Sequence, residues 1–236
     1  MAIVEASQRT SGGRTLAHDV LQRLRSDILN CVLLPNQRLR FETLRDIYGA
    51  SFSTLREALS WLASERLVIV EGQRGFAVAP ISKKELMDVT DARVLVEREC
   101  LAKSIANADE QSRFKILGAF HRLDRLESIK GRPFTPSPEW ESAHSEFHEA
   151  LVANSGSPTL MEIRQALFER ARRYRRLSAL TRAAPRDKTE EHREMMEAVV
   201  AGDLPLAQDL IERHIRATAT NVLNAITEEL PLIRSK

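Results

Sequence analysis

The segment from Leu39 to Leu59 constrains the fold most, because it has the pattern of two short helices joined by a tight turn. Gly49 can adopt the positive φ that ends the first helix, and Ser51 or Ser53 can cap the second. The apolar residues of the second helix recur at i, i+4 and i+7, at Leu55, Leu59 and Leu62. A helix–turn–helix of this kind places its second helix in the DNA major groove.

A hairpin is predicted directly after this pair of helices. Two β-rich runs flank Glu71–Gly75 within Val68–Val78. Residues 15–30, before the pair, predict an amphipathic helix whose apolar face is Leu16, Val20, Leu24 and Ile28. Together these elements predict a winged helix–turn–helix domain over residues 15–80. The alternative is an ordinary helical hairpin, which would not require a basic turn in the wing.

The remainder of the chain is predicted to be helical, and residues 1–14 a flexible tail. Proline and glycine positions divide it into helices at about 82–107, 109–130, 138–154, 158–182, 186–201 and 204–229. No strand pattern follows the wing. Residues 81–236 are therefore expected to form an antiparallel helical bundle, which makes the protein mainly α.

The composition is that of an ordinary globular protein, with 43% hydrophobic and 29% charged residues among 236. A net charge of +2 would not by itself indicate nucleic acid, so the prediction of DNA binding depends on where the arginines lie. No apolar run is long enough to cross a bilayer. Cys31 and Cys100 have no metal or redox spacing, which indicates buried free thiols in a cytoplasmic protein. No membrane partner is expected.

Four of the six histidines have a suggestive arrangement in the predicted bundle. His144 and His148 are spaced i, i+4 and so project from one helix face; His192 and His214 belong to later helices. Bundle helices can direct such side chains into a shared metal site, and imidazole suits divalent transition metals such as zinc, nickel, iron or copper. Four separate surface or core histidines are the alternative.

The first domain resembles the GntR family of bacterial transcription regulators. The matching segments are Leu55–Leu59, Glu65–Val68 and Arg74–Val78, and Leu34–Leu39 stands where the family has a Pro-Gly turn. The family usually has an arginine near the start of the recognition helix, where this chain has Phe52. The resemblance therefore does not by itself predict the operator sequence of this chain.

The second domain resembles FCD, the ligand-sensing domain of the FadR branch of that family. The resemblance implies a divalent metal bound by His148, His192 and His214, with His144 at the family's acidic position. It also implies a small carboxylate effector, paired with Arg93 on the first helix of the domain. A salt bridge from Arg93 to Glu97 is the alternative. The matching segments are Asp91–Glu97, Phe147-His148, Asn154–Gly156, Glu191-His192, Gly202-Asp203 and Arg213-His214.

Two further segments, His144–His148 and Phe168–Arg175, resemble carbon-starvation regulators of glutarate and related catabolism. This narrower resemblance suggests a dicarboxylate effector, contacted by Arg172 and Arg175 among a cluster that also contains Arg173 and Arg176. A solvated or dimer-facing helix side is the alternative for the cluster.

The sequence thus predicts a ligand-responsive regulator, and the family resemblance implies repression. A palindromic double-stranded operator would require a homodimer. The competing hypothesis is a metal-dependent hydrolase with an accessory DNA-binding domain, but His144–His148 does not have the His-Glu-x-x-His order; a constitutive structural DNA-binding protein would not need the bundle. The candidate DNA contacts are Arg40, Ser51, Ser53, Thr54 and Arg56, with Gln73, Arg74 and Gly75 from the wing.

Overall fold

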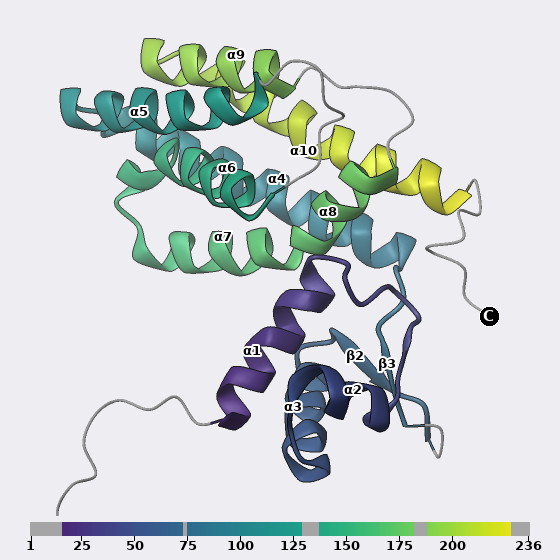
Figure 1. Ribbon diagram of the computed structural model, residues 1–236. Coiled ribbons are helices and arrows are strands. Elements are labelled where there is room, and N and C mark those ends of the chain that lie inside the picture. The colour runs from purple at the N-terminus through teal and green to yellow at the C-terminus, as the bar shows by residue number, and fades with distance from the viewer. Residues whose placement is uncertain (1–15, 73–74, 129–136, 182–187, 228–236) are drawn as a thin grey trace, which may run out of the picture. The chain divides into compact units, whose positions relative to one another are not determined.

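The computed structural model describes residues 16–72, 75–128, 137–181 and 188–227, which fold into two compact units (Figure 1). The first unit contains the chain up to Ile28 and Val32–Ala79. The second contains Leu29–Cys31 and the chain from Pro80 onward. No helix in the described part of the chain is long and apolar enough to cross a membrane.

The first unit is a winged helix–turn–helix. β3 lies between β1 and β2 in an antiparallel sheet, with Val68 opposite Val78 and Leu39 opposite Phe76. The predicted hairpin is therefore present. The strand β1 was not predicted, because two residues are too few to show an alternating pattern. The elements are α1 (Leu16–Leu29), β1 (Arg38–Leu39), α2 (Phe41–Tyr48), α3 (Phe52–Ser64), β2 (Val68–Val70) and β3 (Phe76–Val78).

The turn between α2 and α3 has the predicted chemistry. Gly49 caps the end of α2 with φ 64°, a conformation that costs glycine little. Ser51 caps α3, because its side chain accepts a hydrogen bond from the Thr54 amide at 3.2 Å. The predicted apolar faces of α1 and α3 meet in the core of this unit, where Leu24, Ile28, Leu55, Leu59 and Leu62 are completely buried.

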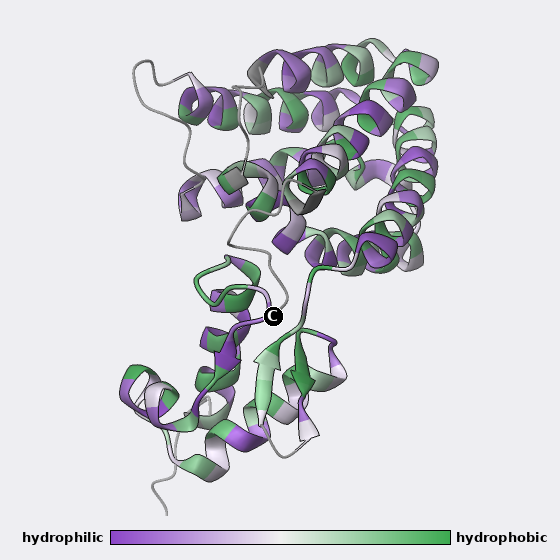
Figure 2. Ribbon diagram, turned by 90° about the vertical axis from the view of Figure 1, so that its right-hand side faces the viewer, coloured by the Kyte–Doolittle hydropathy of each residue, from purple (hydrophilic) through white to green (hydrophobic). Residues whose placement is uncertain are grey.

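The second unit is an all-α bundle. Its longest helices, α4 and α10, pack against each other, while α7 contacts α4, α8 contacts α10, and α5 contacts α6 and α9. Hydrophobic and hydrophilic residues alternate along these helices (Figure 2), as helices around a shared core require. The elements are α4 (Lys83–Ala106), α5 (Glu110–Glu127), α6 (Pro138–Ala150), η2 (Ala153–Ser155), α7 (Pro158–Arg170), α8 (Arg172–Thr181), α9 (Lys188–Ala201) and α10 (Leu204–Thr227).

The single helix predicted over 158–182 is wrong, since the structure has two helices that meet at Ala171. No proline or glycine marks this break. A break leaves carbonyl groups of the last turn without helical donors, and Arg175 supplies one donor, because its Nη1 bonds the Phe168 carbonyl at 2.7 Å. The break thus places a guanidinium against the end of α7.

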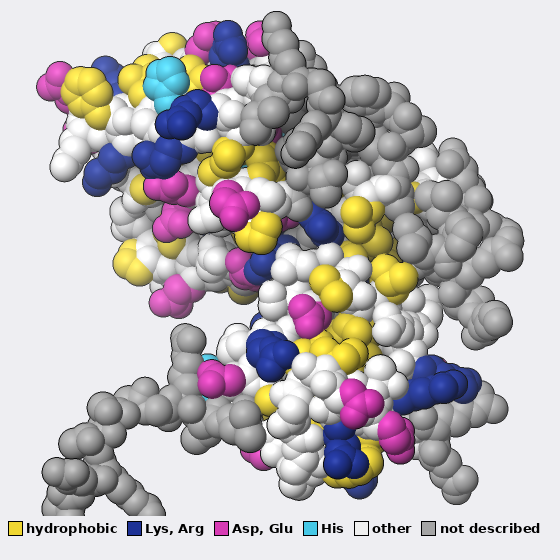
Figure 3. Space-filling view, viewed as in Figure 1, with side chains coloured by type: hydrophobic (Ala, Val, Ile, Leu, Met, Phe, Trp, Pro, Cys, Tyr) yellow, Lys and Arg dark blue, Asp and Glu magenta, His cyan; other side chains and the backbone are white. Residues whose placement is uncertain are grey.

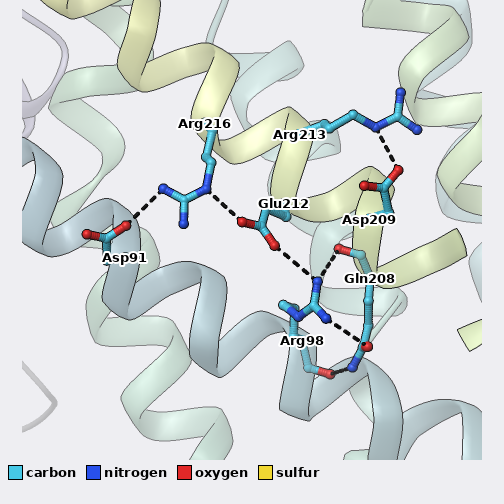
Figure 4. A network of polar contacts seen from close by, with 7 residues as sticks. All are labelled: Asp91, Arg98, Gln208, Asp209, Glu212, Arg213 and Arg216. Atoms are coloured by element: carbon cyan, nitrogen blue, oxygen red, sulfur yellow. Dashed lines mark hydrogen bonds and ion pairs between the residues drawn. The ribbon is translucent and has the colours of Figure 1, made fainter. Parts of the chain in front are cut away.

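Polar side chains on the outside join α4 to α10 (Figure 4). Arg98 Nη1 donates to Glu212 Oε2 at 3.0 Å, and the other oxygen of Glu212 accepts from Arg216 Nε at 2.8 Å. Arg216 also donates to Asp91 on α4 at 2.9 Å. Because these side chains are between about one third and three fifths exposed, each contact stabilises the helix pair only modestly. Acidic and basic side chains are interspersed on the face shown in Figure 3.

Candidate metal centre and DNA-binding surface

The four predicted histidines meet inside the bundle. His144 and His148 come from α6, His192 from α9 and His214 from α10. All four are at most 7% exposed, and one nitrogen from each lies within 4.8 Å of the other three. The Nε2 atoms of His144 and His148 are 3.2 Å apart. The alternative of four separate histidines is therefore wrong, and the cluster could hold a metal ion.

Carboxylates outside the cluster orient two of its rings. His192 Nδ1 donates to Glu127 Oε2 at 3.0 Å, and His214 Nδ1 donates to Glu191 Oε2 at 2.9 Å. A ring that donates from Nδ1 keeps a lone pair at Nε2. Trp140 Nε1 donates to the other oxygen of Glu127 at 3.0 Å and so fixes that carboxylate in turn. Metal-binding histidines commonly have such carboxylate partners.

The other two rings are held neutral. Burial lowers the pKa of His144 and His148 well below 6.5, and the neighbouring rings lower it further. His144 Nδ1, His148 Nδ1 and His192 Nε2 are buried without a hydrogen-bond partner in the described part of the chain. A buried nitrogen without a partner lowers the stability of the fold unless it binds a water molecule or an ion. Neutral imidazoles with free lone pairs fit a transition metal.

Three arginines surround the ring of Phe168 beside the histidines. The guanidinium carbons of Arg93, Arg164 and Arg175 lie 5.2, 5.2 and 3.9 Å from its centroid. Glu97 is the carboxylate among them: its Oε2 accepts from Arg164 Nε at 2.9 Å, and its Oε1 lies 3.5 Å from Arg93 Nη2. The salt bridge from Arg93 to Glu97 is thus present, but it is the longer of the two.

The arginine group keeps unused donor capacity. The Nε atoms of Arg93 and Arg175 are buried and have no hydrogen-bond partner among the described residues. Burial is also the main reason that the pKa of Arg93 is lowered and that of Arg175 falls to about 9. Among the described residues Glu97 is the carboxylate in direct contact with these three guanidiniums, while Glu141 and Glu169 act on Arg175 electrostatically without a direct contact. The immediate surroundings therefore keep an excess of positive charge, which favours an anion.

Arg172 does not belong to this group. Its Nη2 donates to Asn30 Oδ1 at 3.1 Å, and its Nη1 lies 3.8 Å from Glu169. Arg173 and Arg176 likewise donate to the carbonyl groups of Pro80 and Asn30. The predicted arginine cluster is therefore divided, because consecutive residues of a helix project in different directions, and only Arg175 reaches Phe168.

The predicted DNA contacts lie mainly on the exposed surface of the first unit. Arg40 is exposed just before α2, and Ser53 and Arg56 are exposed on α3. Ser51 Oγ is engaged in capping α3 and also contacts the hydroxyl oxygens of Ser53 and Thr54, each at 2.9 Å. In the wing, Gly75 has a positive φ of 90°. The other two predicted wing contacts, Gln73 and Arg74, lie outside the described residues.

Several residues of the metal centre and arginine group were not predicted: Glu127, Trp140, Arg164 and Phe168. Arg164 Nη2 donates to the His148 carbonyl at 2.9 Å, so it connects the arginine group to the helix of two histidines. Glu127 carried no local signal, because it ends α5 after an ordinary amphipathic pattern. Only the helix packing brings these side chains to the histidines.

Both units match protein-family models. Residues 16–78 match the bacterial regulatory proteins of the gntR family, and residues 88–217 match the FCD domain. Two solved structures share the fold at 20–21% identity. They are a putative transcriptional regulator GntR from Rhodococcus sp. RHA1, with a TM-score of 0.68 over 90% of this chain and 99% of that one, and E. coli McbR/YncC, with 0.68 over 92% and 100%.

Relatives of similar length are also transcription regulators. The HTH-type transcriptional repressor GlaR of Escherichia coli (strain K12) is 35% identical over 81% of this chain and 89% of its own. The regulator BphR of Paraburkholderia xenovorans (strain LB400) is 34% identical over 89% and 86%. Neither the families nor these relatives are enzymes, so the hydrolase hypothesis has no support. The chain belongs to the GntR family of bacterial transcription regulators, in the branch with a C-terminal FCD domain.

Proposed function

We propose that this regulator is a homodimeric repressor that acts in the cytoplasm and is released from a palindromic operator by a small dicarboxylate. The effector would bind at a divalent metal ion, zinc, nickel or iron, held by His144, His148, His192 and His214. The observation that carries the proposal is the convergence of these four buried histidines beside Arg93 and Arg175.

The four candidate ligands favour a transition metal that prefers nitrogen donors. All four candidate ligands are imidazoles, and the acidic residue that the FCD resemblance would place among them is His144 here. Imidazole favours zinc, copper, nickel or iron over magnesium or calcium, which prefer oxygen. When bound, the metal would act as a Lewis acid that attracts an effector oxygen. Because none of the four protein ligands is anionic, the metal ion would keep its full positive charge until the effector binds.

The arginines support an effector with a second negative group. Arg93 and Arg175 approach Phe168 from α4 and α8, and the Nε of each has no hydrogen-bond partner among the described residues. Guanidinium and carboxylate form paired, charge-assisted hydrogen bonds. An acid with one carboxylate toward the metal and the other toward these arginines would satisfy both sets of groups. A monocarboxylate would leave one set unsatisfied.

The first unit supports operator binding by two copies. One recognition helix reads too few base pairs for a unique site, and two helices on half-sites about one DNA turn apart require a dimer. Exposed arginines such as Arg40 and Arg56 would contact phosphates or base edges. The effector would bind more tightly to a dimer conformation in which the two winged helix–turn–helix domains do not fit both half-sites.

A metal measurement with a matched control tests the site. Purified protein should contain up to one transition metal ion per chain by elemental analysis. His192→Ala should lose the ion, because only three ligands remain and the contact of the ring with Glu127 is removed as well. His121→Ala, a change at an exposed histidine of α5, should retain it. Equal metal content in both variants would overturn the shared site.

A binding screen tests the effector class. Dicarboxylates with three to six carbons should raise the melting temperature of the metal-loaded protein by mass action, and they should release it from its operator. Monocarboxylates of the same length should do neither at the same concentration. Release by an uncharged or cationic metabolite, with no effect of any dicarboxylate, would overturn this part of the proposal.

A further inference from the structure

Phe52 occupies an unusual position for a large aromatic residue. It is the first residue of α3, the predicted recognition helix, and follows the capping residue Ser51. Its side chain is 46% exposed, although the core of the unit lies on the opposite side of the helix, around Leu55 and Leu59. A large ring that lies outside the buried core and leaves nearly half of its surface exposed indicates a contact surface.

The ring is held in place by its neighbours. Its centroid lies 5.4 Å from that of Phe41, which begins α2 and also contacts Phe76 of the wing at 6.1 Å. The guanidinium of Arg45, an exposed residue of α2, lies 4.9 Å from the centre of the Phe52 ring. This cation–π contact places positive charge directly beside an apolar surface.

The pairing of apolar ring and arginine indicates which part of DNA is read. The first residues of a recognition helix meet the base edges in the major groove. The only apolar group that a base presents there is the C5-methyl group of thymine, which phenylalanine can contact. Phenylalanine has no hydrogen-bonding group and cannot recognise guanine, unlike an arginine in its place.

We propose that Phe52 reads a thymine methyl group in each operator half-site, with Arg45 held over its ring to contact the adjoining backbone. This inference rests on the operator binding proposed above. With Phe52 instead of an arginine at the start of α3, the protein would prefer thymine at one position of each half-site. It also explains why the Phe52 ring stays exposed in the free protein.

The experiment starts from a binding site selected by the purified full-length protein from random duplex DNA. Each thymine of that site is then replaced in turn by uracil, which removes only the methyl group. With the wild-type protein, one thymine per half-site should show a loss of affinity of about fourfold, the factor that corresponds to ~0.8 kcal/mol for one buried methyl-sized group.

A variant assigns that sensitivity to the ring. Phe52→Ala should bind thymine and uracil equally at the sensitive position and should keep any response to uracil elsewhere. Phe114→Ala, which removes a ring that is 65% exposed on α5 of the bundle, should behave as wild type. If Phe52→Ala fails to fold, Phe52→Leu keeps an apolar but smaller side chain and should reduce the thymine preference.

The outcomes separate this inference from the function on which it rests. Selected DNA that binds tightly but shows no uracil-sensitive position overturns the role of Phe52 and leaves the DNA-binding function intact. A sensitive position whose response is unchanged in a folded Phe52 variant also overturns it. Failure of the wild-type protein to select any DNA refutes the operator binding and the reading by Phe52 together.

Discussion

The substitution Glu97→Gln tests whether the buried arginines form a charged unit that needs a counter-ion. Glu97 is 2% exposed and is the carboxylate that contacts both Arg93 and Arg164, which are 5% and 2% exposed. Glutamine keeps the shape and one acceptor oxygen but removes the negative charge. Both guanidiniums then remain buried without the negative charge that balances them.

The expected loss of stability is large. Removing one partner of a buried ion pair typically costs about 3–5 kcal/mol, because the remaining charge is not solvated. For a domain of 150–250 residues, about 1 kcal/mol corresponds to roughly 2–4 °C in melting temperature. The melting temperature of the bundle should therefore fall by roughly 6–20 °C in differential scanning calorimetry of the metal-free protein.

The matched control is Glu146→Gln on α6. Glu146 also forms an ion pair with an arginine, Arg122, but both side chains are about half exposed. An exposed pair contributes about 0–1 kcal/mol, so this variant should melt within a few degrees of wild type. If Glu97→Gln and Glu146→Gln melt at the same temperature, the buried arginines do not depend on Glu97 for compensation and the reasoning fails.

The same variant also tests the affinity of the site for anions. Without Glu97 the site contains one more uncompensated positive charge, so a dicarboxylate should raise the melting temperature of Glu97→Gln by more degrees than that of wild type. A smaller increase in the variant would show that Glu97 positions Arg93 or Arg164 for the ligand. The arginines would then require the carboxylate for their orientation.

Four other changes have defined outcomes. Arg56→Ala should weaken operator binding by ~1–3 kcal/mol if its guanidinium contacts a guanine edge, and unchanged affinity in a mobility-shift titration would exclude that contact. Arg93→Lys, which keeps the charge but loses the planar fork, should still bind the operator but require roughly 10–100-fold more effector for release. Ser137→Ala removes the cap that accepts from the first turn of α6 and should cost ~1 kcal/mol in chemical denaturation. In metal-free protein the lowered pKa of His144 and His148 means that the unfolded chain takes up protons first as pH falls below about 6.5. Stability should therefore be highest above that pH and fall by up to ~1.4 kcal/mol per histidine per pH unit below it; urea unfolding energies that are equal at pH 7.5 and 5.5 would contradict this.

Local sequence patterns were sufficient for the first unit and for the presence of the bundle helices. The φ of Gly49, the cap formed by Ser51 and the buried apolar face of α3 each depend on residues within one or two turns of each other. The spacing of His144 and His148 likewise put both rings on one helix face. Such features can be predicted because the interactions that cause them are local in the sequence.

The parts that were not predicted depend on packing between distant segments. The break at Ala171 has no breaking residue, and its effect on Arg175 becomes apparent only when α8 lies beside α7. Glu127 reaches His192 because α5 packs against α9. No pattern within either helix indicates that contact. For the same reason the arginine series from Arg172 to Arg176 appeared to be one cluster in the sequence.

The charges of the site also bear on whether a single small molecule can control the proposed switch. Changing a conformational ratio from 1:99 to 99:1 requires a ligand to prefer one state by about 5.5 kcal/mol. A hydrogen bond to a charged group contributes about 1.5–3 kcal/mol, so one carboxylate on one guanidinium is insufficient. A dianion that contacts a metal ion and both Arg93 and Arg175 draws on α4, α6, α8, α9 and α10 together, and the sum of these contacts reaches the required range when they are made in only one of the two conformations. Because these groups are distributed over five helices, a ligand that holds them at fixed distances from one another also constrains the packing of those helices. The proposed preference for a dicarboxylate thus follows from the energy that the switch requires as well as from the positive charge of the site.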